Sequence, residues 1–203
     1  MYIGMSGGIS GAANAAAAAV RELKAEYPAL KFAAIDTFAA SLGEGLMVLR
    51  AAELIDSGQT FEEIERFILT GRRHMCQFFT VDDLVYLKRG GRISGTAALI
   101  GSMLNIKPIL KGDDTGHIVM CDKVRGSKRA ILNLAEKYGR LVFDRDVRIG
   151  IAHADNSEGA ARLVELLRER GFGGKCINVC YEPVTGSHVG PGTVALFFYG
   201  MHK

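Results

Sequence analysis

The stretch VDDLVYLKRGGRISGTAALIGSMLNIKPIL, from Val81 to Leu110, carries the signals around which the rest of the chain is organised. It predicts a short amphipathic helix that ends at Gly90-Gly91, because paired glycines favour a left-handed turn over further helix. Ser94 can cap a second helix, which is small or apolar on most of its sides. The residue before Pro108 avoids the helical conformation, so an extended segment is predicted to begin there.

Upstream of this stretch, strands and helices alternate. The predicted strands are 1–5, 31–36 and 75–80, and the predicted helices are 12–26, 46–55 and one that starts after Thr60. Thr60 and Glu63 have the spacing of a capping box, which supports the start of the third helix. When strands and helices alternate in this way, the strands are usually parallel and the loops that follow them lie along one edge of the sheet. A ligand site is expected at that edge.

Downstream, the pattern changes. Asp113-Asp114-Thr115-Gly116 is typical of a hairpin turn and implies antiparallel pairing of strands at 107–111 and 117–124. The remaining predicted elements are helices at 130–138 and 157–170, strands at 146–153, 175–181 and 194–199, and a loop at 185–193. We therefore predict an α/β chain with a parallel βα domain at 1–74 and a mixed-sheet α/β domain at 75–203.

The composition excludes several classes of protein. With 203 residues, 48% of them hydrophobic, the chain can bury a core. A net charge of +3 falls short of the clustered basicity of a nucleic-acid binder, and no apolar run is long enough for a signal peptide or a membrane span. The four cysteines are Cys76, Cys121, Cys176 and Cys180. Their spacing fits neither a metal site nor a disulfide, so reduced thiols and a cytoplasmic location are expected.

The loop after the first predicted strand, here called the first loop, has three possible interpretations. Gly4-Met5-Ser6-Gly7-Gly8 fits G-x-S-x-G between a strand and a helix, the context of a hydrolase nucleophile, with His188 as base and Asp155 as acid. The same loop can instead hold a carboxylate or phosphate on hydroxyls and backbone N–H groups at a helix N-terminus. An ordinary strand-to-helix turn with a serine cap also fits these residues.

Four segments make the chain resemble the DegV family, bacterial fatty-acid-binding proteins that serve as the acyl-carrying subunit of fatty acid kinase. They are MSGGISGAANAA at 5–16, AIDTFAASLGEGLMV at 34–48, the opening stretch with KVRGSKRA at 123–130, and GSHVGPGTVALFFYG at 186–200. The first is similar to the family's serine-rich loop, and the third is long enough to be specific.

The resemblance implies a DegV-like carrier without catalytic activity of its own. One long-chain fatty acid, and no other cofactor or metal, would lie in a tunnel between two domains, and a separate kinase subunit would phosphorylate its carboxylate. The residues implied for the carboxylate are Ser6, Gly7, Ser10 and His188. The helix after the glycine turn would supply tunnel wall through Ala97, Ile100 and Leu104, and the surface facing the kinase would carry Arg92 and Arg125.

Two departures from the family pattern stand out. The second serine of the family's serine pair is Gly7 here, which removes one hydroxyl donor. The family also carries roughly 80 residues before this loop; without them the first domain would be partial, and its unpaired sheet edge predicts self-association. The chain would then be a natural short form or a fragment. A serine hydrolase that uses Ser6 and a fragment without ligand are the alternative hypotheses.

Overall fold

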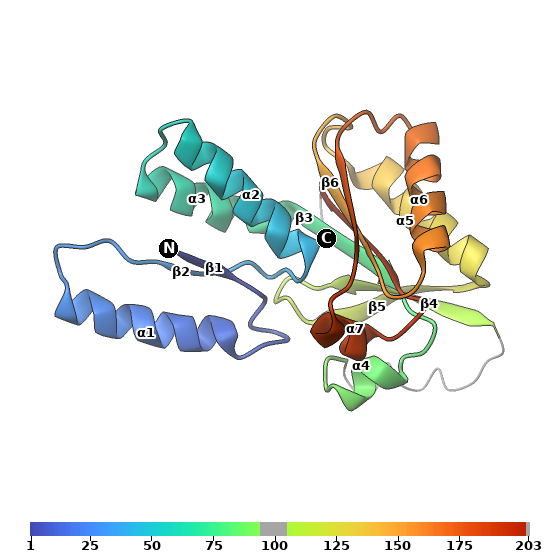
Figure 1. The fold of residues 1–203 in the computed structure, drawn as a ribbon, viewed down its shortest axis with the longest axis horizontal. Helices are drawn as coiled ribbons and strands as arrows, with labels where there is room; N and C mark the ends of the chain where they lie inside the picture. Colours follow the sequence, from blue (N-terminus) through green and yellow to red (C-terminus); the bar gives the residue numbers. More distant parts are fainter. Residues whose placement is uncertain (94–104, 202–203) are drawn as a thin grey trace.

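The computed structural model describes residues 1–93 and 105–201. The chain begins with a parallel pair of strands, β1 (Tyr2–Gly4) and β2 (Ala34–Asp36), joined through the helix α1 (Ala12–Glu26). These two strands lie between α1 and the pair formed by α2 (Leu42–Asp56) and α3 (Phe61–Gly71) (Figure 1). The predicted second helix of the opening stretch, with Ala97, Ile100 and Leu104, lies outside the described residues.

In the part of the chain that the structure describes, a larger sheet has six strands in the order β5-β4-β3-β8-β6-β7. Its strands are β3 (Met75–Thr80), β4 (Ile106–Gly112), β5 (Ile118–Arg125), β6 (Ile149–His153), β7 (Cys176–Cys180) and β8 (Val194–Tyr199). Neighbouring strands are antiparallel except β6 and β7, which are parallel. The sheet is mixed, and the predicted α/β class and the predicted β4–β5 hairpin are both confirmed.

Helices cover both faces of the larger sheet. On one face, α5 (Ser127–Leu141) and α6 (Ser157–Glu169) bury a cluster that includes Phe78 and Phe198. On the other face, Leu46 and Met47 of α2 pack with Phe197 of β8. Strand alternation produces this division, because successive side chains of a strand point to opposite faces. The amphipathic helices then bury their apolar sides on the face they meet.

Local sequence accounts for several helix ends. Thr60 Oγ1 accepts the N–H of Glu63 and the Glu63 carboxylate accepts the N–H of Thr60, so the predicted capping box at the start of α3 is confirmed. Asn156 Oδ1 accepts the N–H of Gly159 and caps α6 in the same way. At its other end α6 stops before Gly171, whose φ of +85° favours glycine.

One predicted loop is wrong. Residues 185–193 are not loop throughout, because the helix α7 (Pro183–Val189) occupies their first half. Glu182 caps this helix by accepting the N–H groups of Val184 and Thr185, and Pro183 fits its first turn because proline lacks an N–H that would stay unsatisfied there. Two further helical segments are a 3-10 turn, Arg72–His74, and α4 (Val85–Arg89).

The helix α2 connects the two sheets. It contacts β1 of the small sheet as well as β3, β6 and β8 of the large one, and Ile35 of β2 belongs to the same hydrophobic cluster as Phe197 of β8. The division at residue 74 stays a prediction.

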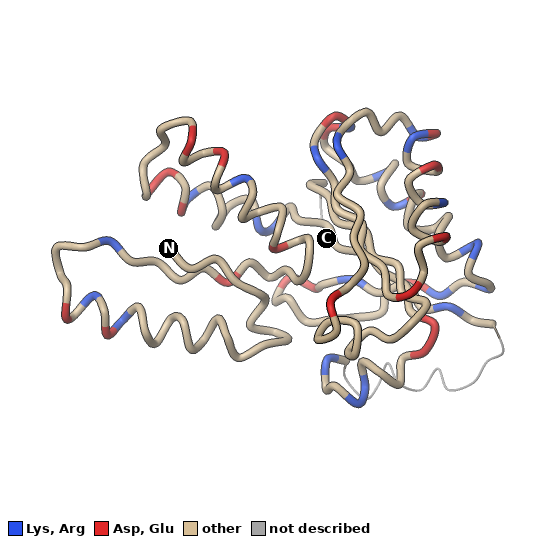
Figure 2. The backbone as a smooth tube through the Cα atoms, viewed as in Figure 1, with Lys and Arg blue, Asp and Glu red and all other residues tan. Residues whose placement is uncertain are grey.

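Helix α1 buries one residue, Ala13, and its charged side chains lie in its last turns (Figure 2). None of the helices that the structure describes has both the length and the apolar character needed to cross a membrane.

Candidate ligand-binding site

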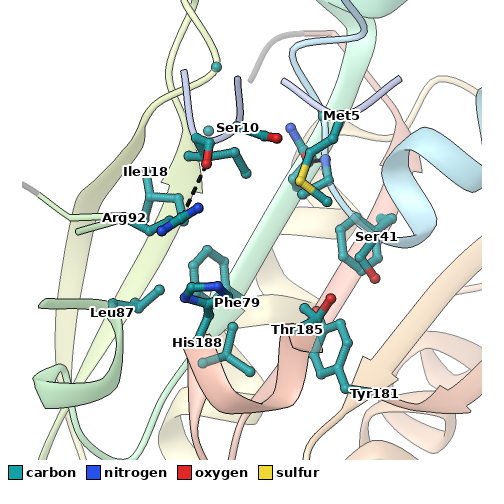
Figure 3. Close-up of a pocket in the computed structure, with 18 of the residues that line it drawn as sticks. Met5, Ser10, Ser41, Phe79, Leu87, Arg92, Ile118, Tyr181, Thr185 and His188 are labelled. Atoms are coloured by element: carbon teal, nitrogen blue, oxygen red, sulfur yellow. Dashed lines mark hydrogen bonds between the residues drawn. The ribbon is translucent and has the colours of Figure 1, made fainter. Parts of the chain in front are cut away.

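A cavity of about 300 Å³ lies where the first loop, the loop after β2, the β4–β5 hairpin and the helices α4 and α7 meet (Figure 3). Most of its wall is apolar. The larger apolar lining side chains are Met5, Ile9, Phe38, Phe79, Leu87, Ile118, Val184, Val189 and Phe197. A largely apolar cavity of this size with a few polar groups is the usual form of a small-molecule site.

Close packing of α4 against α7 shapes one side of the cavity. Gly190 and Gly192, which follow α7, have φ of +78° and +83°. A Cβ atom at Gly190 would overlap the ring of Tyr86, and one at Gly192 would overlap the carboxylate of Asp82. Glycine is therefore needed at both positions. Because it lets the segment after α7 lie close to α4, Leu87 of α4 reaches the cavity.

The polar end of the cavity is built from three segments that lie far apart in the sequence. Arg92 Nε donates to the carbonyl oxygen of Ile9 at 3.1 Å, and Arg92 Nη1 donates to the carbonyl oxygen of Gly90. Gly90 in turn lies against His188, whose Nδ1 would overlap a Cβ atom at that glycine. Ser10, Arg92 and His188 thus line the same cavity (Figure 3).

These three side chains suit an anion. Guanidinium and imidazole N–H groups and a hydroxyl are hydrogen-bond donors, and donors that carry charge form the strongest bonds to a carboxylate. The Ser10 oxygen accepts the N–H of Ala12 at 3.2 Å, and its proton has no acceptor among the described residues. An apolar chain with one carboxylate matches the apolar wall and the polar end together.

A second polar group faces the cavity beside Met5. It consists of Ser41, Thr185 and Tyr181 (Figure 3). Burial raises the pKa of the Tyr181 phenol, and the Ser41 hydroxyl beside it opposes that shift. The phenol therefore stays protonated at neutral pH and can act as a donor.

The loop between β2 and α2 forms a strained part of the wall. Phe38 and Ser41 have φ of +53° and +52°, which non-glycine residues rarely adopt. Asp36 Oδ1 accepts the N–H of Phe38 at 2.8 Å, and Gln77 Nε2 donates to the Phe38 carbonyl oxygen at 2.9 Å. Gln77 Oε1 also accepts the N–H of Ala40 at 2.9 Å. The surrounding contacts thus hold a conformation that costs of order 1–3 kcal/mol per residue.

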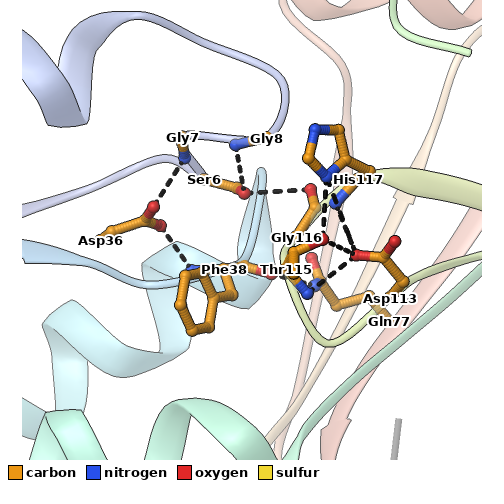
Figure 4. A network of polar contacts seen from close by, with 10 residues as sticks. All are labelled: Ser6, Gly7, Gly8, Asp36, Phe38, Gln77, Asp113, Thr115, Gly116 and His117. Atoms are coloured by element: carbon orange, nitrogen blue, oxygen red, sulfur yellow. Dashed lines mark hydrogen bonds and ion pairs between the residues drawn. The ribbon is translucent and has the colours of Figure 1, made fainter.

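Ser6 and Gly7 do not line the cavity. Ser6 is 1% exposed, and its Oγ donates to the carbonyl oxygen of Gly116 at 3.0 Å and accepts the N–H of Gly8 at 3.1 Å (Figure 4). The N–H of Gly7 donates to Asp36 Oδ2 at 2.9 Å. The Ser6 proton therefore points to a main-chain carbonyl, whereas a serine nucleophile needs a base as its acceptor. Carboxylate binding by Ser6 and Gly7 stays a prediction.

The two arginines implied for a partner surface lie in different places. Arg92 is half-buried in the cavity wall, and Arg125 is exposed at the end of β5. The other end of β5 is Ile118, which lines the cavity and is separated from Arg125 by the length of the strand, roughly 20 Å; Arg125 itself does not line the cavity. The roles of both in partner binding stay predictions.

Strand β3 contributes lining residues that were not identified from the sequence. Gln77 and Phe79 line the cavity, while Cys76 and Phe78 are buried on the opposite face of the sheet. Alternation along Met75–Thr80 was visible in the sequence and separates these two sets. The alternation does not tell which face of the strand borders the cavity, because other parts of the protein cover both faces.

The part of the chain that the structure describes contains no group of three or more His, Cys, Asp or Glu side chains placed to hold a metal ion. The four cysteines are free thiols. Burial raises the pKa of the Cys121 and Cys176 thiols. A raised pKa lowers the thiolate fraction at neutral pH, which disfavours both metal binding and nucleophilic chemistry at these two side chains.

Comparison with known proteins gives consistent matches over nearly the whole chain. The model of the DegV family, described as one of uncharacterised proteins, matches residues 1–200. A DegV domain-containing protein of Clostridium perfringens is 40% identical over 205 residues, covering 100% of this chain and 70% of that relative.

Solved structures are similar as well. The fatty acid binding DegV family protein from Streptococcus agalactiae has a TM-score of 0.84 and 32% identity, covering 97% of this chain and 68% of that one. The Streptococcus pneumoniae fatty acid kinase B3 protein, loaded with linoleic acid, has a TM-score of 0.86, covering 96% of this chain and 69% of that one. Its identity is 24%, so this likeness concerns the fold alone.

Proposed function

Since this chain belongs to the DegV family, we propose that it binds one long-chain fatty acid in the cavity lined by Ser10, Arg92 and His188. The carboxylate lies at these three side chains, and the acyl chain lies against the apolar wall. The protein acts as a carrier: it holds the fatty acid and catalyses no reaction itself.

The observation that carries this proposal is the pairing of one cationic end with a largely apolar wall. Each buried CH2 group contributes about 0.8 kcal/mol, so ten of them contribute about 8 kcal/mol. The charged hydrogen bond from Arg92 then fixes which end of the ligand lies where. An uncharged apolar ligand would leave the guanidinium without its anion, and a small hydrophilic anion would leave the apolar wall without contacts.

The partner that we propose is a fatty acid kinase subunit, which receives the carboxylate and converts it to an acyl phosphate. Support comes from the structural neighbour of Streptococcus pneumoniae, named as a fatty acid kinase B3 protein. The exposed Arg125 is a candidate contact for that partner, because a guanidinium can pair with an acidic or phosphorylated group. We place this carrier in the cytoplasm, where such a kinase finds its ATP.

The test is extraction of lipid from the purified protein, followed by mass spectrometry of the extract and of the intact protein under native conditions. We expect fatty acid at up to one molecule per chain, and added oleate should raise the melting temperature by mass action. Absence of fatty acid from the extract, together with no thermal shift on addition of oleate, would overturn the proposal.

A further inference from the structure

A second cavity, of about 640 Å³, lies between α2, α3 and the segment that precedes β6. It shares no lining residue with the first cavity. The fatty acid proposal leaves this cavity without a role.

Part of the lining of this cavity is apolar. Phe143 and Val147, both before β6, keep 55% and 41% of their surface exposed, and Phe67 of α3 also lines the cavity. The ring of His74 lies 5.2 Å from that of Phe143. Single exposed apolar residues are ordinary on a protein surface, whereas aromatic side chains that converge on one cavity are typical of a ligand site.

The charged rim is positive. Glu53 is held between Arg50 at 3.0 Å and Arg148 at 2.8 Å, so these three groups together carry one positive charge. Lys175 adds a second and has no ion pair among the described residues. The remaining acid, Asp146, subtracts one, so these five groups together carry one positive charge; its carboxylate lies close to Gly173, where a Cβ atom would overlap it.

Tyr199 also lines the cavity. The Tyr199 hydroxyl is buried and has no hydrogen-bond partner among the described residues. Burial raises the pKa of Tyr199 to about 12, so the hydroxyl keeps its proton at neutral pH. The oxygen has almost no accessible surface, so a ligand in the cavity does not reach it, and the proposal below does not depend on this hydroxyl.

From the apolar lining side chains and the cations Arg148 and Lys175, we infer that this cavity is a second ligand site. Its ligand is an anion, a carboxylate, sulfonate or phosphate, that is joined to an aromatic or short acyl group. The anionic group lies at Arg148 and Lys175, and the apolar group lies between Phe67 and Phe143.

The probe for this site is anilinonaphthalene sulfonate, an aromatic anion that fluoresces when it leaves water. It is titrated into protein saturated with oleate, so that the first cavity is filled. We expect one saturable site, weakened about ten-fold by Lys175→Glu, which reverses the charge of an exposed side chain. Arg162→Glu on α6 is the control, because it also reverses the charge of an exposed side chain, one that lies outside both cavities.

A second variant protects the test against loss of folding. Arg148→Gln removes one of the two arginines beside Glu53, and circular dichroism checks that it is folded. No saturable probe binding to the oleate-filled protein would overturn the inference. So would equal affinity of the Lys175→Glu and Arg162→Glu proteins. Oleate binding is measured on the same samples, so failure here is distinct from failure of the fatty acid proposal.

Discussion

At the scale of single residues, Arg92 has the most distinctive position. Its guanidinium holds the carbonyl oxygens of Ile9 and Gly90, and so ties the first loop to the glycine turn while it faces the cavity. Arginine stays protonated throughout the physiological pH range. Arg92 can therefore hold two segments of the cavity wall in place and at the same time neutralise the carboxylate of a ligand.

We expect Arg92→Ala to weaken fatty acid binding at least ten-fold, because a hydrogen bond to a charged group contributes about 1.5–3 kcal/mol. Isothermal titration with oleate measures this. Arg125→Ala is the control: it removes the same charge from an exposed position outside the cavity, and lipid affinity should not change. Equal losses in the two variants would contradict a cavity role for Arg92.

At the scale of elements, the contact between α4 and α7 decides the shape of the site. The two helices are short, with bounds Val85–Arg89 and Pro183–Val189, and cannot be stable alone. They are held by their mutual packing and by Val81, Leu87 and Val189, which share a small buried cluster. His188 reaches the cavity because α7 ends against the ring of Tyr86.

Gly190→Ala should disturb this contact. The φ of +78° disfavours any side chain, and the new Cβ atom would overlap the Tyr86 ring, so unfolding free energy should fall by about 2 kcal/mol. Oleate affinity should fall as well. Urea unfolding and oleate titration measure the two effects. The control is Gly186→Ala within α7, where the nearest atom to a new Cβ is 4.0 Å away and helix propensity rises.

At the scale of the whole molecule, the two sheets are joined at the first loop as well as through α2. Ser6 donates to Gly116 at the tip of the β4–β5 hairpin, across 110 positions of sequence. Asp113 Oδ1 orders that tip by accepting the N–H groups of Thr115 and His117 (Figure 4). The cavity is closed on this side because the hairpin tip and the first loop stay together.

We expect Ser6→Ala to lower the unfolding free energy by about 1–3 kcal/mol, since it leaves the N–H of Gly8 and the Gly116 carbonyl oxygen without this partner. Hydrogen exchange should speed up at residues 6–8 and 113–117. A fluorophosphonate probe should not label the unmodified protein, because the Ser6 proton has no base as acceptor. Labelling at Ser6 would instead support the hydrolase hypothesis.

The sequence by itself determined most of the elements. Predicted and observed bounds agree for α1 (Ala12–Glu26), β3 (Met75–Thr80) and β8 (Val194–Tyr199), because helical periodicity, capping residues and β-branched or aromatic runs act over a few neighbouring residues. The same local rules misjudged 185–193, where the cap residue Glu182 is not among those usually preferred at this position.

Only the tertiary structure decided which of these residues form a site. Ile9, Arg92 and His188 meet because three separate segments bury their apolar sides against one another. The local sequence does not predict that these segments lie close together. The same packing withdrew Ser6 from the cavity, since its hydroxyl found the Gly116 carbonyl oxygen. Residue type and motif thus predicted the chemistry that is available, and long-range burial selected which side chains face the ligand.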